Sequence, residues 1–193
     1  MLQETNTYTS FMMDRAAGAL SPAEAAAADL HIALSDEGAG TSAVWDALGG
    51  ALLEEQCADF GQPHRLDIIG EDQEATETPH GFLSGDLTDR KWRRSFWGAR
   101  ISDAGLPNAT LLRLDPGTSA PRHGHSRRDV TVVLEGAFAD EYGLYERGDI
   151  VFGEPGHHHK PRALGDKPCI CFVATEPPRP LLSRLFGALR LRA

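Results

Sequence analysis

Residues 117–136 read GTSAPRHGHSRRDVTVVLEG, and residues 148–161 read GDIVFGEPGHHHKP. Both stretches are short runs of β-forming residues separated by glycines at positions where turns are expected. Many short strands at close spacing are typical of an antiparallel sandwich or barrel. The pattern continues on both sides, and we predict strands at Lys91–Ile101, Thr110–Leu114, Asp129–Leu134, Ala137–Asp140, Asp149–Phe152 and Cys169–Ala174.

The same two stretches carry a candidate metal site. Side chains at i, i+2 and i+6 of one strand lie on one face, so an unbroken strand turns His123, His125 and Asp129 the same way. His159 follows a Pro155-Gly156 turn, and antiparallel pairing would bring it opposite these three. Imidazoles with a carboxylate suit zinc, iron, manganese, nickel or copper. We predict one divalent metal ion at these four residues, with zinc expected first.

The alternative is that these histidines are solvated. A single histidine is more often a surface residue than a ligand, and His157-His158-His159 alone could be an exposed loop. The combined pattern of histidines and turn glycines favours the metal site. His159 is preferred to His157 because the pattern ends there, and His158 has the opposite parity and is expected to point away.

The N-terminal part, residues 1–56, is expected to be a small helical bundle. Ser21 and Glu24 have the spacing of a capping box, and the pattern that they begin ends at Gly38-Ala39-Gly40. A second helix is predicted over Thr41–Gln56, with Val44, Leu48, Leu52 and Leu53 on one face, and a short earlier one over Thr9–Ala17. We interpret residues 57–90 as a linker, in which apolar periodicity is visible only at Leu66–Ile69. Residues 91–193 are interpreted as the β-domain with a C-terminal tail, Pro180–Ala193.

Composition limits the function. The 193 residues carry a formal net charge of −9, which argues against direct binding to nucleic acid and is compatible with a basic protein partner. Arg93, Arg94 and Arg100 fit an amphipathic strand better than a nucleic-acid surface. The N-terminus lacks the features of a signal peptide, and no apolar run is long enough to span a bilayer. We therefore expect a reduced, cytoplasmic protein that does not contact membranes.

The stretch from Gly117 to Pro161 resembles a cupin. The first cupin motif is matched by Gly117, His123, His125, Asp129 and Gly136, and the second by Gly148, Pro155, Gly156 and His159. The resemblance implies an all-β antiparallel jelly-roll barrel. Together with the helical bundle expected before it, the predicted fold is mixed. The usual acidic residue is glutamate, and Asp129 is shorter by one methylene, so it is expected either to bind the metal directly or to act through a water molecule.

The whole layout is similar to the ChrR-type anti-sigma factors. The resemblance rests on residues 16–21, Leu30-His31, Asp36-Glu37 and residues 47–55, and on the cupin motifs with 159–161 and 169–175. It implies that the helical domain sequesters an RNA polymerase sigma factor of the extracytoplasmic-function (ECF) group. It also implies that the cupin is needed for release of that factor under oxidative stress such as singlet oxygen.

This chain departs from the family at the metal ligands of the helical domain. The family binds zinc there through an early histidine and a His-Xaa3-Cys-Xaa2-Cys run, whereas this chain keeps His31 but has Ser35 and Gly38 at the cysteine positions. A hydroxyl and a glycine cannot replace two thiolates. We therefore predict no zinc in the helical domain, with His31 a partly buried polar residue.

Three functions remain in competition. The first is a ChrR-like transcriptional regulator. The second is a metal-dependent cupin enzyme of the dioxygenase or isomerase type, disfavoured by the lack of a visible acid–base set. The third is a structural metal barrel. Cys169 and Cys171 are expected on one face of a strand. They could act as a redox sensor, but we favour the interpretation that they are small apolar residues of the barrel wall. Homodimerisation is open, because cupins often pair through their sheets.

Overall fold

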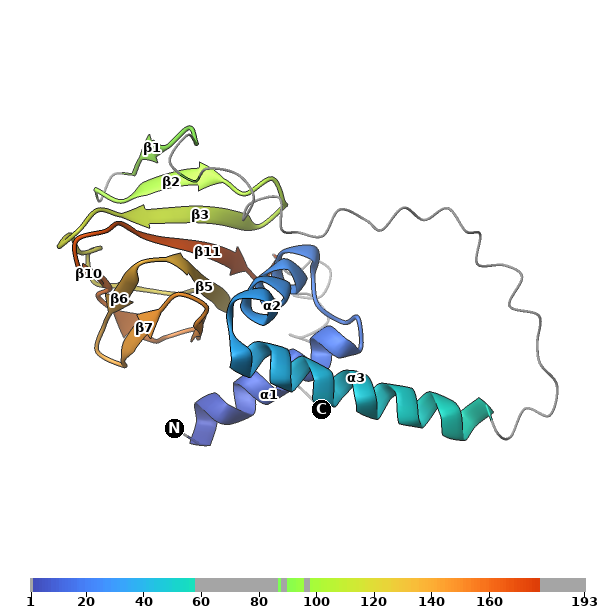
Figure 1. The fold of residues 1–193 in the computed structure, drawn as a ribbon. Coiled ribbons are helices and arrows are strands. Elements are labelled where there is room, and N and C mark those ends of the chain that lie inside the picture. The colour runs from blue at the N-terminus through green and yellow to red at the C-terminus, as the bar shows by residue number, and fades with distance from the viewer. Residues whose placement is uncertain (1, 58–86, 88–89, 96–97, 178–193) are drawn as a thin grey trace, which may run out of the picture.

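The computed structural model describes residues 2–57, 87, 90–95 and 98–177, and these residues form three helices followed by antiparallel β-sheets (Figure 1). The helices are α1 (Leu2–Ala16), α2 (Pro22–Leu34) and α3 (Asp36–Cys57). The predicted capping box begins α2: the Glu24 N–H donates to Ser21 Oγ at 3.4 Å, and the Ser21 N–H donates to the Glu24 carboxylate at 3.1 Å. The first helix is longer than predicted and begins seven residues before Thr9.

The break between α2 and α3 lies at Ser35, so the prediction that Gly38-Ala39-Gly40 ends the helix was wrong. Ser35 has an extended backbone (φ −134°, ψ 131°), and its Oγ accepts the Gly38 N–H at 3.2 Å, which caps the start of α3. Gly38 lies inside α3 where that helix meets α2. A Cβ there would lie 2.7 Å from the His31 ring, so glycine permits the close approach.

Within the described part of the chain, the strands form three sheets, in the orders β1-β2-β3-β11-β5-β8, β10-β6-β7 and β4-β9. Every pairing between the named strands is antiparallel, as the cupin resemblance implied. The bounds are β1 (Arg93–Arg94), β2 (Arg100–Asp103), β3 (Ala109–Leu114), β4 (His123–Gly124), β5 (Asp129–Glu135), β6 (Ala137–Ala139), β7 (Leu144–Glu146), β8 (Ile150–Gly153), β9 (His158–His159), β10 (Arg162–Leu164) and β11 (Cys169–Thr175).

Several predicted strand boundaries need correction. The single strand expected at Lys91–Ile101 is two strands, β1 and β2, which pair with each other. Strands β4, β7, β9 and β10 were not predicted, because two or three residues are too few to show an alternating pattern. The apolar run Leu66–Ile69 and the tail Pro180–Ala193 lie outside the described residues. The division at residues 57–90 stays a prediction.

The outer face of the six-stranded sheet packs against α2, so helices and barrel share one apolar core. Val132 of β5, Phe172 of β11 and Leu30 of α2 are fully buried in it. Alternate residues of β5 face the opposite way, toward the inside of the barrel. The same strand therefore contacts the helices with one face and lines the barrel with the other.

Two polar contacts connect α2 to the barrel. The Arg128 guanidinium donates to Glu24 Oε1 at 3.0 Å. Burial by itself would raise the pKa of the Glu24 carboxyl, but hydrogen bonds from Ser21 and Arg128 outweigh that effect and hold the pKa below its ordinary value of 4.5. His31 lies within hydrogen-bond distance of the Gly148 carbonyl oxygen at 2.7 Å. Gly148 has φ +96°, and a Cβ there would lie 2.5 Å from the Leu34 carbonyl oxygen, so this turn requires glycine.

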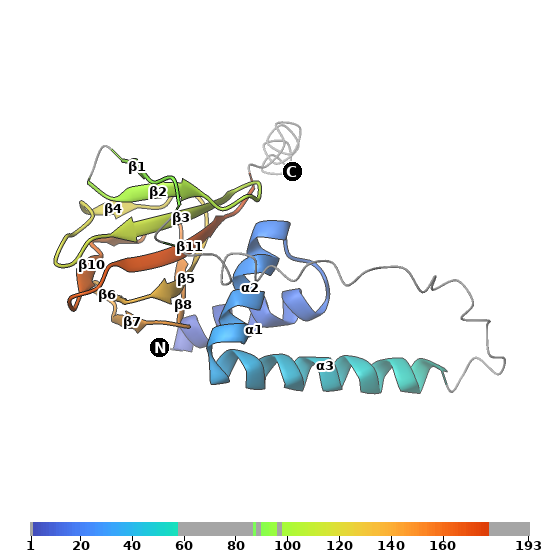
Figure 2. The ribbon, with the colours of Figure 1, turned by 45° about the horizontal axis from the view of Figure 1, so that its top comes forward.

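Helix α3 runs away from the rest of the described structure. Its first turns pack beside α1 and α2, while its C-terminal half lies beside no other described element (Figures 1 and 2). Val44, Leu48 and Leu52 on this helix are exposed. None of the described helices has the length and apolar character needed to cross a membrane.

Candidate metal centre

The shortest sheet brings two of the predicted ligands together. Strands β4 and β9 pair so that His123 lies directly opposite His159. His125 follows β4 and forms an isolated bridge with Pro155. His123 and Asp129 lie in separate strands, so the premise of one unbroken strand was wrong. The expected pairing of His159 with the His123 segment is confirmed.

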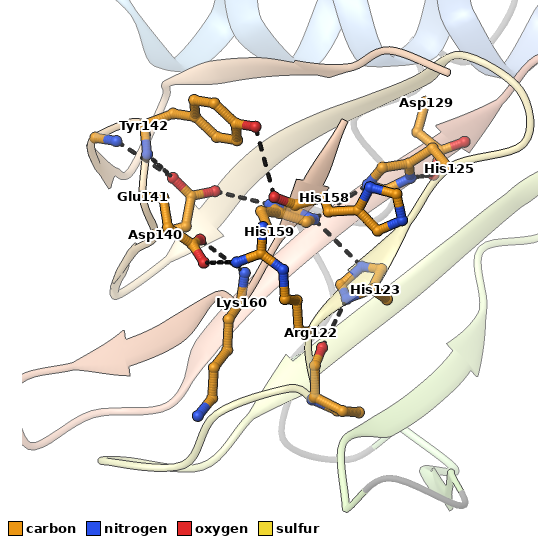
Figure 3. Close-up of polar contacts among 12 residues, drawn as sticks. Arg122, His123, His125, Asp129, Asp140, Glu141, Tyr142, His158, His159 and Lys160 are labelled. Atoms are coloured by element: carbon orange, nitrogen blue, oxygen red, sulfur yellow. Dashed lines mark hydrogen bonds and ion pairs between the residues drawn. The ribbon is translucent and has the colours of Figure 1, made fainter. Parts of the chain in front are cut away.

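The three imidazoles point their Nε2 atoms at one another (Figure 3). His159 Nε2 lies 3.1 Å from His125 Nε2 and 3.2 Å from His123 Nε2. These three residues form the group that could hold a metal ion among the described residues. His157 and His158 lie outside it, as the parity argument expected for His158.

The opposite nitrogen of each ring faces an acceptor. His123 Nδ1 lies 2.9 Å from the Pro121 carbonyl oxygen. His125 Nδ1 lies 2.7 Å from Asp129 Oδ2, and His159 Nδ1 lies 2.7 Å from Asp140 Oδ2. Carbonyls and ionised carboxylates only accept, so each Nδ1 carries the hydrogen. A neutral ring with its hydrogen on Nδ1 presents a lone pair at Nε2.

When the three rings are neutral, their facing lone pairs have no hydrogen to share, and a cation between them removes the repulsion. Two nitrogens bound at about 2.0–2.1 Å to one ion are about 2.9–3.4 Å apart, and the observed separations fall in that range. Burial lowers the pKa of the His123 imidazole, which favours the neutral form that a metal needs. The donor set thus fits a divalent transition metal.

Asp129 lies beside the triad of His123, His125 and His159, where its carboxylate accepts the Nδ1 hydrogen of His125. It is not in the group whose ligand atoms converge. Direct coordination by Asp129 stays a prediction. In the geometry described, its carboxylate orients His125.

Asp140 is a site residue that the sequence analysis missed. Its side chain is 1% exposed and accepts from His159 Nδ1 through one oxygen. The other oxygen accepts the N–H groups of Tyr142 at 2.9 Å and Gly143 at 3.2 Å. Such outer partners fix the ring orientation and the tautomer of a metal-binding histidine. The residue closed a predicted strand, and no spacing linked it to the motifs.

The cysteines Cys169 and Cys171 are free and buried in the barrel wall, with their Sγ atoms 3.7 Å apart. The contact with Cys169, together with burial, raises the pKa of the Cys171 thiol well above its ordinary value. Both thiols belong to an apolar cluster with Leu114 and Phe138. These features favour the wall interpretation over an activated redox pair.

His31 has protein partners at both ring nitrogens and is 2% exposed. Nδ1 faces the Gly148 carbonyl oxygen, so it donates, and Nε2 lies 3.0 Å from the Tyr8 hydroxyl. The Tyr8 hydroxyl also lies 3.2 Å from Thr41 Oγ1. In this geometry His31 connects all three helices to the turn before β8, and it is more deeply buried than predicted.

Comparison with known proteins identifies related chains. The model of the ChrR cupin-like domain family matches residues 100–179. The anti-sigma-E factor ChrR of Cereibacter sphaeroides is 30% identical over 181 residues, which cover 84% of this chain and 85% of that protein. A crystal structure of Rhodobacter sphaeroides SigE in complex with the anti-sigma ChrR matches with a TM-score of 0.71 and 31% identity, covering 87% of this chain and 96% of that one.

Proposed function

The chain belongs to the ChrR-type anti-sigma factors, and from that premise we propose that its helices bind and sequester a sigma factor, of the ECF group, while its cupin barrel holds a metal ion and senses stress. One relative of known structure, ChrR, was solved in complex with a sigma factor, SigE. The observation on this chain that carries the proposal is the apolar face of α3.

That face consists of Val44, Leu48 and Leu52, spaced four residues apart on one side of the helix. Their exposed fractions are 66%, 48% and 55%. Residues at i, i+4 and i+8 form a continuous stripe. Large aliphatic side chains grouped in this way indicate a protein partner. The stripe is the predicted face of the Thr41–Gln56 helix, less Leu53, whose side chain lies outside the description.

Charge favours the same class of partner. The chain carries a formal net charge of −9. A sigma factor must contact DNA phosphates, which requires a basic surface on that protein. An acidic protein is attracted to such a surface over distances of about 10 Å at moderate salt. A partner of this kind acts where RNA polymerase works, so we place the protein in the cytoplasm.

In the barrel we propose one metal ion held by His123, His125 and His159, with Asp129 as a candidate fourth ligand. Zinc is expected first because it accepts three imidazoles and one carboxylate, and iron, manganese and nickel remain alternatives. When bound, the ion supplies a Lewis-acidic site. The chain's own residues orient the three rings and hold their protons on Nδ1.

The test is capture of a sigma factor by matched variants of the full chain. Leu48→Asp puts a charge in the middle of the α3 stripe, and Leu144→Asp makes the same change at a 57%-exposed leucine of β7. We expect Leu48→Asp to weaken binding at least about 30-fold, or about 2 kcal/mol, and Leu144→Asp to leave it unchanged. Equal affinity in both variants would rule out α3 as the binding surface.

A further inference from the structure

A cavity of about 1390 Å³ lies between the metal triad and the helices. Its walls include the triad, the barrel residues Leu112, Val151 and Val173, and the helix residues Tyr8 and Glu37. The whole of β8, the edge strand of the large sheet, also lines it. A ligand that fills this cavity would contact both halves of the protein.

The barrel part of the cavity has an aliphatic stretch at Leu112, Val151 and Val173, beside threonines of the same strands (Thr110, Thr131 and Thr175), and it is not closed. Leu112, Val151 and Val173 lie on the inward face of their strands, yet each is only half-buried. Leu114 and Phe138, farther along the same walls, are buried. Side chains usually fill the interior of a small barrel, unless the barrel holds a ligand. Half-buried aliphatic residues around a hollow favour an apolar ligand body of several carbons.

The polar end of the cavity is the triad itself. Asp129 and Asp140 are already engaged by His125 and His159, so the polar groups that converge at this point are the three Nε2 atoms. A metal ion held there supplies the positive charge that a carboxylate requires. An apolar wall with one convergent polar centre is the usual make-up of a small-molecule site.

We propose that this cavity binds a small aliphatic carboxylate, with its carboxylate at the triad and its chain along Leu112 and Val173. The same cavity also reaches Tyr8 of α1 and Glu37 of α3, and we extend the proposal to a ligand of this site that acts as an effector of the helices. That last step rests on the proposed sigma-factor function, whereas the binding site itself does not.

The test is calorimetric titration of the zinc-loaded full chain with three probes. Octanoate has both the carboxylate and the aliphatic chain. Acetate has the carboxylate without the long chain, and 1-octanol has the chain without the carboxylate. Burial of several methylenes predicts that octanoate binds at least about 100-fold more tightly than acetate. Octanol is expected to bind at least about 10-fold more weakly than octanoate. Chelation of zinc is expected to weaken the binding of octanoate and to leave the binding of octanol unchanged. Equal affinity for octanoate and acetate, or no heat from octanoate, overturns the proposal.

Two variants locate the site. Val173→Trp fills the barrel, and Leu164→Trp puts the same ring on the outer β10 surface, where Leu164 is 36% exposed. Octanoate binding should disappear in the first and persist in the second, and binding that survives Val173→Trp overturns the proposed location. Contacts between octanoate methylenes and the Leu112 methyls, measured by nuclear Overhauser effects on the unmodified chain, test the location even if Val173→Trp fails to fold. No sigma factor is present, so failure here leaves the anti-sigma proposal standing.

Discussion

Replacing Asp140 by asparagine tests how the triad is oriented. One Asp140 oxygen accepts two backbone N–H groups, from Tyr142 and Gly143, and the other accepts from His159 Nδ1. In the variant, the amide oxygen must stay with the two backbone donors, which leaves the NH2 group facing the Nδ1 hydrogen of His159. Two donors cannot pair, so His159 must move its hydrogen to Nε2, the atom that points into the triad.

The expected loss of metal affinity is large, because the His159 ring then presents a hydrogen where the metal needs a lone pair. Loss of such an outer partner typically lowers metal affinity about 10–100-fold, or about 1.4–2.8 kcal/mol. Competition with a chromophoric chelator measures the affinity, and circular dichroism checks the fold. Asp103→Asn is the control, because Asp103 accepts a backbone N–H in an exposed turn away from the triad. Zinc affinity within twofold of wild type in a folded Asp140→Asn variant would refute the tautomer argument.

Three further outcomes follow from the geometry. His123→Ala should lose the bound metal, and His158→Ala should keep it. Metal analysis of the purified variants measures this, and equal metal content in both would exclude the triad as the metal site. Glu24→Gln should lower the free energy of unfolding by about 1.5–3 kcal/mol at pH 7. The lowered pKa of Glu24 stabilises the fold above the ordinary value of 4.5, and this effect is lost as pH falls through the lower pKa of the folded protein. The difference in urea unfolding between wild type and variant should therefore shrink steadily as pH falls below 4.5, and a difference that stays constant would contradict this assignment. Cys169 and Cys171 should resist alkylation at pH 7 until the protein unfolds, because both thiols are buried and the Cys171 thiol has a raised pKa. Peptide mass spectrometry maps the labelled cysteines. Rapid labelling of the native protein would contradict their place in the barrel wall.

The sequence predicted the site better than it predicted the strands that build it. The spacing of His123, His125 and His159 identified the triad, although the reason offered, one strand with one parity, was wrong. Pairing of two very short strands brings these residues together, and two-residue strands leave no periodic pattern. Asp140 was invisible because its role depends on a contact with His159, nineteen positions away.

In the helical part, local signals were reliable and tertiary ones were not. The Ser21 capping box is a contact between near neighbours, and it was found. Gly38 suggested a helix end because glycine is a weak helix former, whereas its role is to let α3 approach His31. The contact between His31 and Gly148 spans 117 positions, so no local pattern could have indicated it.

The most direct test of the central claim is native mass spectrometry of the intact protein, purified under reducing conditions from its own cells. We expect a stoichiometric complex of this chain with one sigma factor, formed without any metal in the helical segment. A chain that carries its barrel metal and is recovered without any sigma factor would contradict the proposed anti-sigma function.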